Sequence, residues 1–240
     1  LPDLDAIPEE TARRAKFIYI NYPNNPTGAV ATKAFYEKLV AWAKTYEVGV
    51  VSDLAYGALG YRGYENPSFL STPGAKDVGI EFYTFSKTFN MAGWRLAFAA
   101  GNDQMIEALN LIQDHLFVGI FPALQEAGIA ALLDPKSEEA VAQLNAVYDS
   151  RRDAFVQAAA KIGWQAFPSK GSFYAWMPVP EGYTSESFAD LLLEKAHVAV
   201  APGKGFGPAG DAYVRIGLLV EPERLVEAVD RIANLHLFNN

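Results

Sequence analysis

Residues 81–95 have the sequence EFYTFSKTFNMAGWR. The apolar and aromatic run over 80–85 predicts a buried strand, and it is followed by small hydroxyl residues and a single lysine, Lys87. Arg95 comes a short loop later. Lysine is seldom fully buried, and desolvation or a neighbouring cation lowers its pKa and leaves a free amine that can form Schiff bases. We therefore interpret Lys87 as a reactive amine.

Three more strands are predicted around this one, over 16–21, 48–52 and 96–100, together with an amphipathic helix over 32–46. The alternation predicts an α/β fold, a mostly parallel sheet with helices on both faces. Asn25, Asp53 and Lys87 each follow the carboxyl end of a strand. Ligands of open α/β sheets bind at that edge, so we expect these side chains to converge there.

The second half of the chain predicts a different arrangement. Residues 103–133 are expected to be helical and 135–162 to form a long helix, followed by strands over 173–177, 198–201 and 213–220. Helices are expected over 188–196 and from Pro222 onward. We therefore predict a large domain over 1–134, a connecting helix over 135–162 and a smaller C-terminal α+β domain over 163–240.

Composition limits the possible partners. The 240 residues are half hydrophobic, carry a formal net charge of -8 and include no cysteine. Nucleic acids and anionic membranes require clustered Lys and Arg, so neither is expected as a main partner. No apolar run has the length of a membrane span and no signal peptide is visible, which predicts a cytoplasmic protein. The chain starts without Met, and we expect it to be a piece of a longer protein.

The motifs resemble a known family. Asn25-Pro26-Thr27-Gly28, Ser52-Asp53-Leu54-Ala55-Tyr56, Thr84-Phe85-Ser86-Lys87, Arg95 and Tyr213-Val214-Arg215-Ile216-Gly217 occur in the order found in class I/II aminotransferases, which are fold type I pyridoxal-phosphate enzymes. The resemblance runs from about residue 16 to the end of the chain. The stretch Asn-Met-Ala-Gly-Trp-Arg after the lysine is most similar to the subgroup that includes alanine and LL-diaminopimelate aminotransferases.

The resemblance implies that pyridoxal 5'-phosphate is the cofactor and that the large domain binds it. Lys87 would bind the cofactor covalently and then carry the proton between the substrate Cα and the cofactor. Asp53 would pair with the pyridinium nitrogen, and Tyr56 and Asn25 would bind the phenolate oxygen. A carboxylate about 4 Å from the pyridinium proton contributes roughly 4 kcal/mol at an effective dielectric of 20. This corresponds to about three pKa units and would keep the nitrogen protonated.

Anion binding is the role implied for three further residues. Thr84 and Arg95 would bind the cofactor phosphate, and Arg215 would bind the α-carboxylate of the amino acid or 2-oxo acid substrate, with Asn25 beside it. A guanidinium stays charged and can donate two parallel hydrogen bonds to such groups, which suits the role. On a strand, Arg215 would face away from Val214 and Ile216.

Two other functions remain open on the same motifs. A lyase or decarboxylase would use the same cofactor site, because the motifs fix the cofactor and not the bond that is broken. A non-catalytic ligand-sensing or interaction domain derived from this fold is the third possibility. The glycine-containing phosphate loop, the ring-stacking aromatic residue and the N-terminal arm of the family are not found upstream of Asn25. The family also implies a homodimer.

Several conspicuous residues are assigned structural roles. His115, His197 and His236 lie far apart, so no metal site is expected. The loop 203–207, with three glycines and one lysine, lacks the full spacing of a phosphate loop and is interpreted as a turn near the cleft. Trp42 and Trp164 are expected in the core, whereas Tyr174 and Trp176 could line the cleft.

Overall fold

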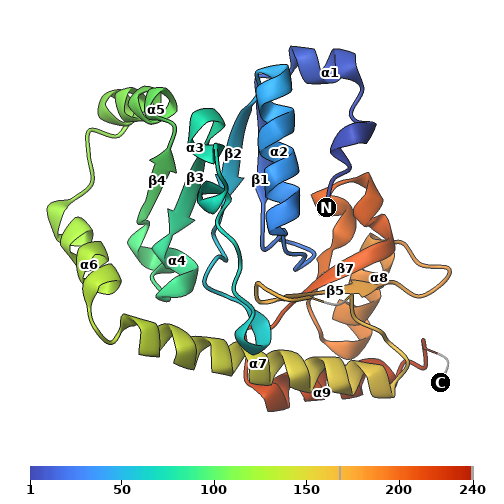
Figure 1. Ribbon diagram of the computed structural model, residues 1–240. Helices are drawn as coiled ribbons and strands as arrows, with labels where there is room; N and C mark the ends of the chain where they lie inside the picture. Colours follow the sequence, from blue (N-terminus) through green and yellow to red (C-terminus); the bar gives the residue numbers. More distant parts are fainter. Residues whose placement is uncertain (168, 239–240) are drawn as a thin grey trace. The chain divides into compact units, whose positions relative to one another are not determined.

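A computed structural model of the chain describes residues 1–167 and 169–238 (Figure 1). Pro168, Asn239 and Asn240, which belong to the predicted C-terminal domain over 163–240, lie outside the described residues. Contacts between residues divide the chain into two compact units. The first comprises Leu1–Pro23, Val30–Gly60 and Glu65–Ala142; the second comprises Asn24–Ala29, Tyr61–Tyr64 and Gln143–Asn240. The domain boundaries derived from the sequence stay predictions.

The first unit is built on a four-stranded sheet in the order β1 (Phe17–Asn21), β2 (Gly49–Asp53), β3 (Gly79–Thr84), β4 (Ala97–Gly101). The first three strands are parallel and β4 is antiparallel to β3. The mostly parallel α/β fold is therefore confirmed. Between β3 and β4 lie only the one-turn helix α4 (Phe85–Thr88) and a 3₁₀ turn, Ala92–Trp94. This connection reverses the chain without a crossover helix, which is why β4 runs the other way.

Helices flank this sheet. The predicted amphipathic helix is α2 (Lys33–Tyr46), and it begins where the Thr32 side chain accepts a hydrogen bond from the Phe35 amide. Its apolar face, including Leu39 and Ala43, packs with Ile20 of β1 and Val50 of β2 in one buried cluster, and Figure 1 shows α2 alongside β1. Trp42 is only partly buried at the border of this cluster. The remaining short helices are α1 (Glu9–Arg14) and α3 (Ala75–Val78).

The helical stretch predicted over 103–133 consists of two helices, α5 (Asp103–Leu116) and α6 (Pro122–Leu133). The break falls where Val118 and Gly119 both have positive φ, and Pro122 then occupies the first turn of α6. These residues stop one helix and start the next because a positive φ leaves the helical region and proline suits a helix start.

The second unit contains a three-stranded antiparallel sheet in the order β5 (Tyr174–Pro178), β7 (Tyr213–Gly217), β6 (Ala201–Pro202). Both later strands are shorter than predicted. Beyond β7, Leu219 and Val220 are about half exposed and unpaired in the sheet, so hydrophobic composition alone did not fix the end of the strand. Likewise, of the segment predicted as 198–201 only Ala201 lies in β6.

Three helices cover the inner face of this sheet. The long helix α7 (Ser137–Lys161) connects the two units, α8 (Ser185–Leu191) continues as a π-helical segment (Leu192–Ala196), and α9 (Pro222–Ala233) ends the fold. The core combines side chains of the sheet with those of all three helices, and Val214 and Val229 belong to it. Its largest member is Trp164, which is 1% exposed as expected and contacts the rings of Phe155 and Phe188 edge-on. This core holds the sheet against α7, α8 and α9.

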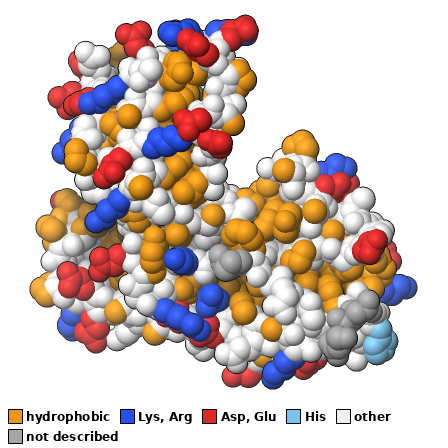
Figure 2. All heavy atoms as spheres, turned by 45° about the vertical axis from the view of Figure 1, so that its right-hand side comes forward, with side chains coloured by type: hydrophobic (Ala, Val, Ile, Leu, Met, Phe, Trp, Pro, Cys, Tyr) orange, Lys and Arg blue, Asp and Glu red, His pale blue; other side chains and the backbone are white. Residues whose placement is uncertain are grey.

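Acidic and basic side chains are interspersed on the face of the molecule drawn in Figure 2. None of the described helices combines the length and apolar character that crossing a membrane would need.

Candidate active site

The carboxyl edge of the first sheet carries Asp53 and Thr84, which are the last residues of the adjacent parallel strands β2 and β3. Asp53 is exposed, and its Oδ1 accepts a hydrogen bond from the Ala55 amide at 3.0 Å. Asn21, the last residue of β1, donates its side-chain amide to the Asp53 carbonyl at 3.0 Å. The ladder itself therefore brings the carboxylate to the edge of the sheet, and a local turn fixes its orientation.

Lys87 lies in the helix α4 just past β3. The predicted strand over 80–85 ends at Thr84, because the Thr84 hydroxyl caps α4 by accepting from the Ser86 amide at 3.1 Å. The same hydroxyl donates to Ser86 Oγ at 3.0 Å. Phe85 is buried, whereas Lys87 is partly exposed. The cap thus places two hydroxyls and an amine within one turn of helix at the end of β3.

Tyr56 and Arg95 are the other predicted cofactor ligands of the first unit. Tyr56 follows β2 and is 5% exposed. Arg95 ends the 3₁₀ turn in the left-handed conformation, at φ 53°, and its Nη1 donates to the Ala92 carbonyl at 3.0 Å. Its side chain is exposed, so the guanidinium remains accessible to an anion.

Asn25 and Arg215 lie together in the second unit. Arg215 Nη1 donates to Asn25 Oδ1 at 2.7 Å, although the two residues are 190 positions apart. The Arg215 Cζ also lies 4.3 Å from the ring centroid of Tyr174 and 4.8 Å from that of Phe206. Its buried Nε has no hydrogen-bond acceptor among the described residues. The guanidinium is therefore oriented by one amide and two aromatic rings.

A tight turn presents Asn25. Asn24 Oδ1 accepts from both the amide and the hydroxyl of Thr27, at 3.1 and 2.8 Å, and the Gly28 amide donates to the Asn24 carbonyl at 2.8 Å. Gly28 has φ +68°, and a Cβ placed there would lie 2.2 Å from Ser169 Oγ. Only glycine fits this close approach, so the Asn-Pro-Thr-Gly motif has a geometric reason at its last position.

The structure divides the predicted site residues between the two units. The first unit holds Asp53, Tyr56, Thr84, Lys87 and Arg95, whereas Asn25 and Arg215 belong to the second. Sequence reasoning gave no role to one residue that contacts this set, Phe206. The sequence feature that could have pointed to Phe206 was its position inside the loop 203–207, but this loop was interpreted only as a turn near the cleft.

That loop is indeed a 3₁₀ turn, η6 (Gly203–Phe206). Lys204 Nζ forms an ion pair with Glu186 at 2.6 Å, and this hydrogen bond raises the pKa of the ammonium above its ordinary value. The loop lysine therefore already has a carboxylate partner. As for the histidines, no group of three or more metal-ligating side chains in 1–167 and 169–238 is arranged to hold a metal ion.

Comparison with known proteins identifies the family of the chain. The model of the family described as aminotransferase class I and II matches residues 2–232. The chain belongs to this family. It is 58% identical over 238 residues to L-glutamine--4-(methylsulfanyl)-2-oxobutanoate aminotransferase of Bacillus subtilis, covering 99% of this chain and 59% of the relative.

Further members of the family are similar over the same part of their length. LL-diaminopimelate aminotransferase of Moorella thermoacetica is 50% identical over 232 residues, covering 97% of this chain and 59% of the relative. Among solved structures, apo-BacF from Bacillus subtilis has a TM-score of 0.95 at 46% identity and covers 100% of this chain and 61% of that one. An aminotransferase from Staphylococcus aureus has a TM-score of 0.95 at 40% identity, covering 100% and 63%. This aminotransferase-family chain thus spans about 60% of the length of its relatives.

Proposed function

We propose that this chain is the part of a pyridoxal 5'-phosphate-dependent aminotransferase that binds the cofactor and the substrate carboxylate. The reaction would move an amino group between an amino acid and a 2-oxo acid. The observation that carries the proposal is the placement of Asp53 and Lys87 at the carboxyl ends of adjacent strands, in a chain of the class I and II family.

The donor set of the first unit fits the cofactor. An amine, a carboxylate, a phenol, two hydroxyls and a guanidinium suit the aldehyde, ring nitrogen, ring oxygen and phosphate of pyridoxal phosphate in chemistry and charge. Lys87, Asp53 and Tyr56 would hold the ring, whereas Thr84 and Arg95 would hold the phosphate. When bound, the cofactor supplies an electron sink for the charge left at the substrate Cα.

Two residues would act on protons. The Lys87 amine would take the proton from the substrate Cα and deliver it to the cofactor C4′, which requires an amine that is neutral when it accepts the proton. The Asp53 carboxylate would keep the ring nitrogen protonated by a favourable charge interaction. Because Ala55 already donates to Oδ1, the carboxylate is held in one orientation before the cofactor binds.

Substrate anchoring would fall to the second unit. Arg215 would bind the α-carboxylate, and the hydrogen bond from its Nη1 to Asn25 would hold the guanidinium in place. Every α-amino acid has that carboxylate, so the contact selects the class of substrate and not the side chain. The names of the relatives suggest glutamine, 4-(methylsulfanyl)-2-oxobutanoate and LL-diaminopimelate as the first substrates to examine.

The test is chemical trapping followed by a transfer assay. We expect borohydride to attach the cofactor to the peptide that contains Lys87, as measured by mass spectrometry. Lys87→Ala is expected to abolish both this attachment and amino transfer. Lys76→Ala changes an exposed lysine of the same unit, and both readouts should survive in that variant. A Lys87→Ala protein that still transfers amino groups contradicts the proposal.

Product analysis separates transfer from the lyase and decarboxylase alternatives. An aminotransferase consumes one 2-oxo acid for each 2-oxo acid that it forms, and it releases neither ammonia nor carbon dioxide. Product that forms without a 2-oxo acid acceptor would favour a lyase or decarboxylase. Tight cofactor binding without transfer to any acceptor would favour a ligand-sensing domain.

The proposal also includes a homodimer that works in the cytoplasm. Exposed apolar side chains on and between α5 and α6, namely Leu111, Ile112, Leu116, Phe117 and Phe121, support an assembly that covers this surface. Light scattering of the purified protein and cell fractionation test the two statements separately.

A further inference from the structure

The outer face of the three-stranded sheet carries aromatic side chains around Arg215. Along β5 and β7, the residues Ala175, Met177, Val214 and Ile216 enter the core, so Tyr174, Trp176, Tyr213 and Arg215 share the opposite face. The rings of Trp176 and Tyr213 stack at 5.3 Å. Tyr174 packs against the Arg215 guanidinium. The arginine is therefore set in an aromatic surface.

A loop adds a second ring to the guanidinium. Phe206 comes from η6, lies 4.8 Å from Arg215 Cζ, and contacts the Trp176 ring edge-on at 6.1 Å. The loop backbone is shaped for this position. Gly207 has φ 128° and ψ 160°, which L-residues with a side chain avoid, and Gly203 packs so closely that a Cβ would lie 2.1 Å from the Gly210 carbonyl.

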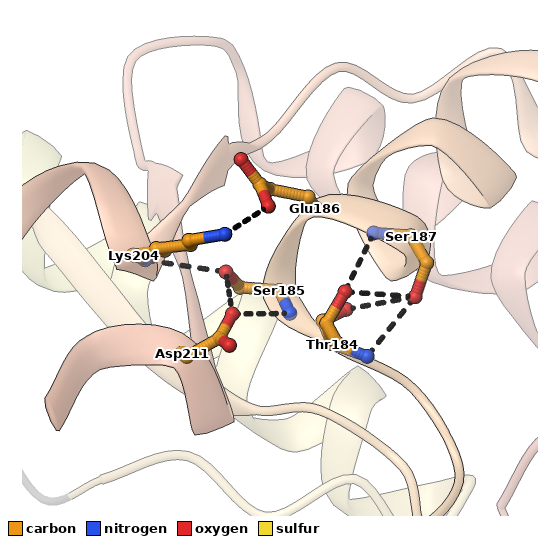
Figure 3. Close-up of polar contacts among 6 residues, drawn as sticks. All are labelled: Thr184, Ser185, Glu186, Ser187, Lys204 and Asp211. Carbon is orange, nitrogen blue, oxygen red and sulfur yellow. Dashed lines mark hydrogen bonds and ion pairs between the residues drawn. The ribbon is translucent and has the colours of Figure 1, made fainter. Parts of the chain in front are cut away.

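A buried serine fastens this loop (Figure 3). Ser185 is fully buried, and its Oγ donates to Asp211 Oδ1 at 2.8 Å while accepting from the Lys204 amide at 3.2 Å. It thereby ties residues on both sides of Phe206 to the start of α8. The ion pair between Lys204 and Glu186 joins the same elements, but both side chains are about half exposed, so it contributes little.

We propose that Phe206 is a positioning residue for substrate-carboxylate recognition, and that Ser185 acts through it by holding the loop. This inference rests on the proposed role of Arg215. The Phe206 ring lies against the guanidinium by a cation–π contact and limits the directions in which the side chain can turn. Rings packed on a guanidinium leave its edge for acceptors, and its edge is where a carboxylate can accept two parallel hydrogen bonds. The buried Nε without an acceptor among the described residues agrees with a ligand on that edge.

The first experiment measures carboxylate binding without cofactor or turnover. The Arg215 Nε proton is buried and therefore protected from exchange, so its NMR signal can be assigned by its loss in Arg215→Lys. Propanoate is titrated against the full chain, with propanamide as the uncharged control. We expect Phe206→Ala to weaken propanoate binding about fivefold, equivalent to about 1 kcal/mol for the lost cation–π contact. Phe206→Tyr should bind propanoate as tightly as the wild type, whereas Phe206→Leu, whose side chain is large but has no ring, should bind it as weakly as Phe206→Ala.

The second experiment examines the serine. Ser185→Ala is expected to weaken propanoate binding in the same direction, and the double variant with Phe206→Ala should show no further loss, because both changes act on one contact. Ser187→Ala is the matched control, since Ser187 bonds only with Thr184 among the residues of Figure 3. Additive losses would show that Ser185 does not act through Phe206.

The outcomes separate this inference from the proposed function. Unchanged propanoate binding in a folded Phe206→Ala protein overturns the positioning role, whatever the transfer assay shows. A wild-type signal that does not respond to propanoate overturns it as well. Conversely, a protein that binds propanoate through Arg215 and Phe206 but neither traps cofactor on Lys87 nor transfers amino groups contradicts only the proposed function.

Discussion

Gly28→Ala tests the close contact that holds the Asn-Pro-Thr-Gly turn. The new Cβ would lie 2.2 Å from Ser169 Oγ and 2.8 Å from Ser169 Cβ, in a residue whose φ is +68°. The left-handed conformation costs an L-residue about 1–2 kcal/mol, and overpacking a buried site costs about 1–3 kcal/mol. We therefore expect a loss of about 2–5 kcal/mol in the free energy of unfolding. For a chain of this size, a loss of about 3 kcal/mol lowers the Tm by roughly 6–12 °C.

Ser169→Gly provides the control, because it removes the atoms that the new methyl group would overlap. In the double variant Gly28→Ala/Ser169→Gly the overlap is relieved but the strained φ remains. A double-mutant cycle from thermal unfolding should therefore show a favourable coupling of about 1–3 kcal/mol. If Gly28→Ala lowers stability by less than about 0.5 kcal/mol, the range of a neutral surface change, or if the cycle shows no coupling, the packing argument is wrong.

Three further predictions concern single side chains. Burial raises the pKa of Tyr61, so the folded state keeps its phenol proton while the unfolded state loses it near pH 10. The stabilisation by Tyr61 is complete below that pH and is lost as the pH rises towards the pKa of the folded state. Between pH 9 and 11, the free energy of unfolding measured with urea should fall less steeply in Tyr61→Phe, by up to about 1.4 kcal/mol per pH unit. Glu81 is 6% exposed and accepts a hydrogen bond from Ser52 Oγ at 2.9 Å. Glu81→Ala should lower the free energy of unfolding, measured with urea, by about 2–4 kcal/mol, and Glu81→Gln should lower it by less because it keeps a carbonyl acceptor. Asn25→Asp places a carboxylate against Arg215, so propanoate binding should fall further than in Asn25→Ala; equal or tighter binding in Asn25→Asp would show that the arginine charge does not recognise the ligand.

Local sequence predicted the first sheet well. Runs of β-branched and aromatic residues, each ended by a polar residue such as Asp53, are sufficient to locate parallel strands and the edge where their ends meet. The same runs did not predict where a strand becomes a helix, because the Thr84 cap that ends β3 depends on one hydroxyl and not on hydrophobicity. The sequence analysis also gave no direction for β4, because the direction of this strand depends on the length and shape of the connection from β3.

Contacts over long distances in the sequence account for the rest. The segment Tyr61–Tyr64 belongs to the second unit because the Arg62 amide and guanidinium bond to Asp149 and Asp153 of α7, 87 and 91 residues away. Phe206 reaches Arg215 only because β6 and β7 pair and the intervening loop folds back. No local pattern encodes such pairs, so the motifs singled out Arg215 as a candidate carboxylate ligand but not the Phe206 ring beside it.

The Asn-Pro-Thr-Gly motif shows how these two levels combine. Thr27, together with the preceding Asn24, closes the turn by local hydrogen bonds, and Gly28 allows the turn to pack on Ser169, 141 residues away. Asn25 Oδ1 accepts a hydrogen bond from Arg215. The residues of the motif therefore act on different properties: changes at Thr27 or Gly28 should alter stability first, whereas a change at Asn25 should alter carboxylate binding in a protein that remains folded. The turn has to form before the Asn25 side chain can reach the arginine, so a change that loosens the turn should also weaken carboxylate binding under the proposed function.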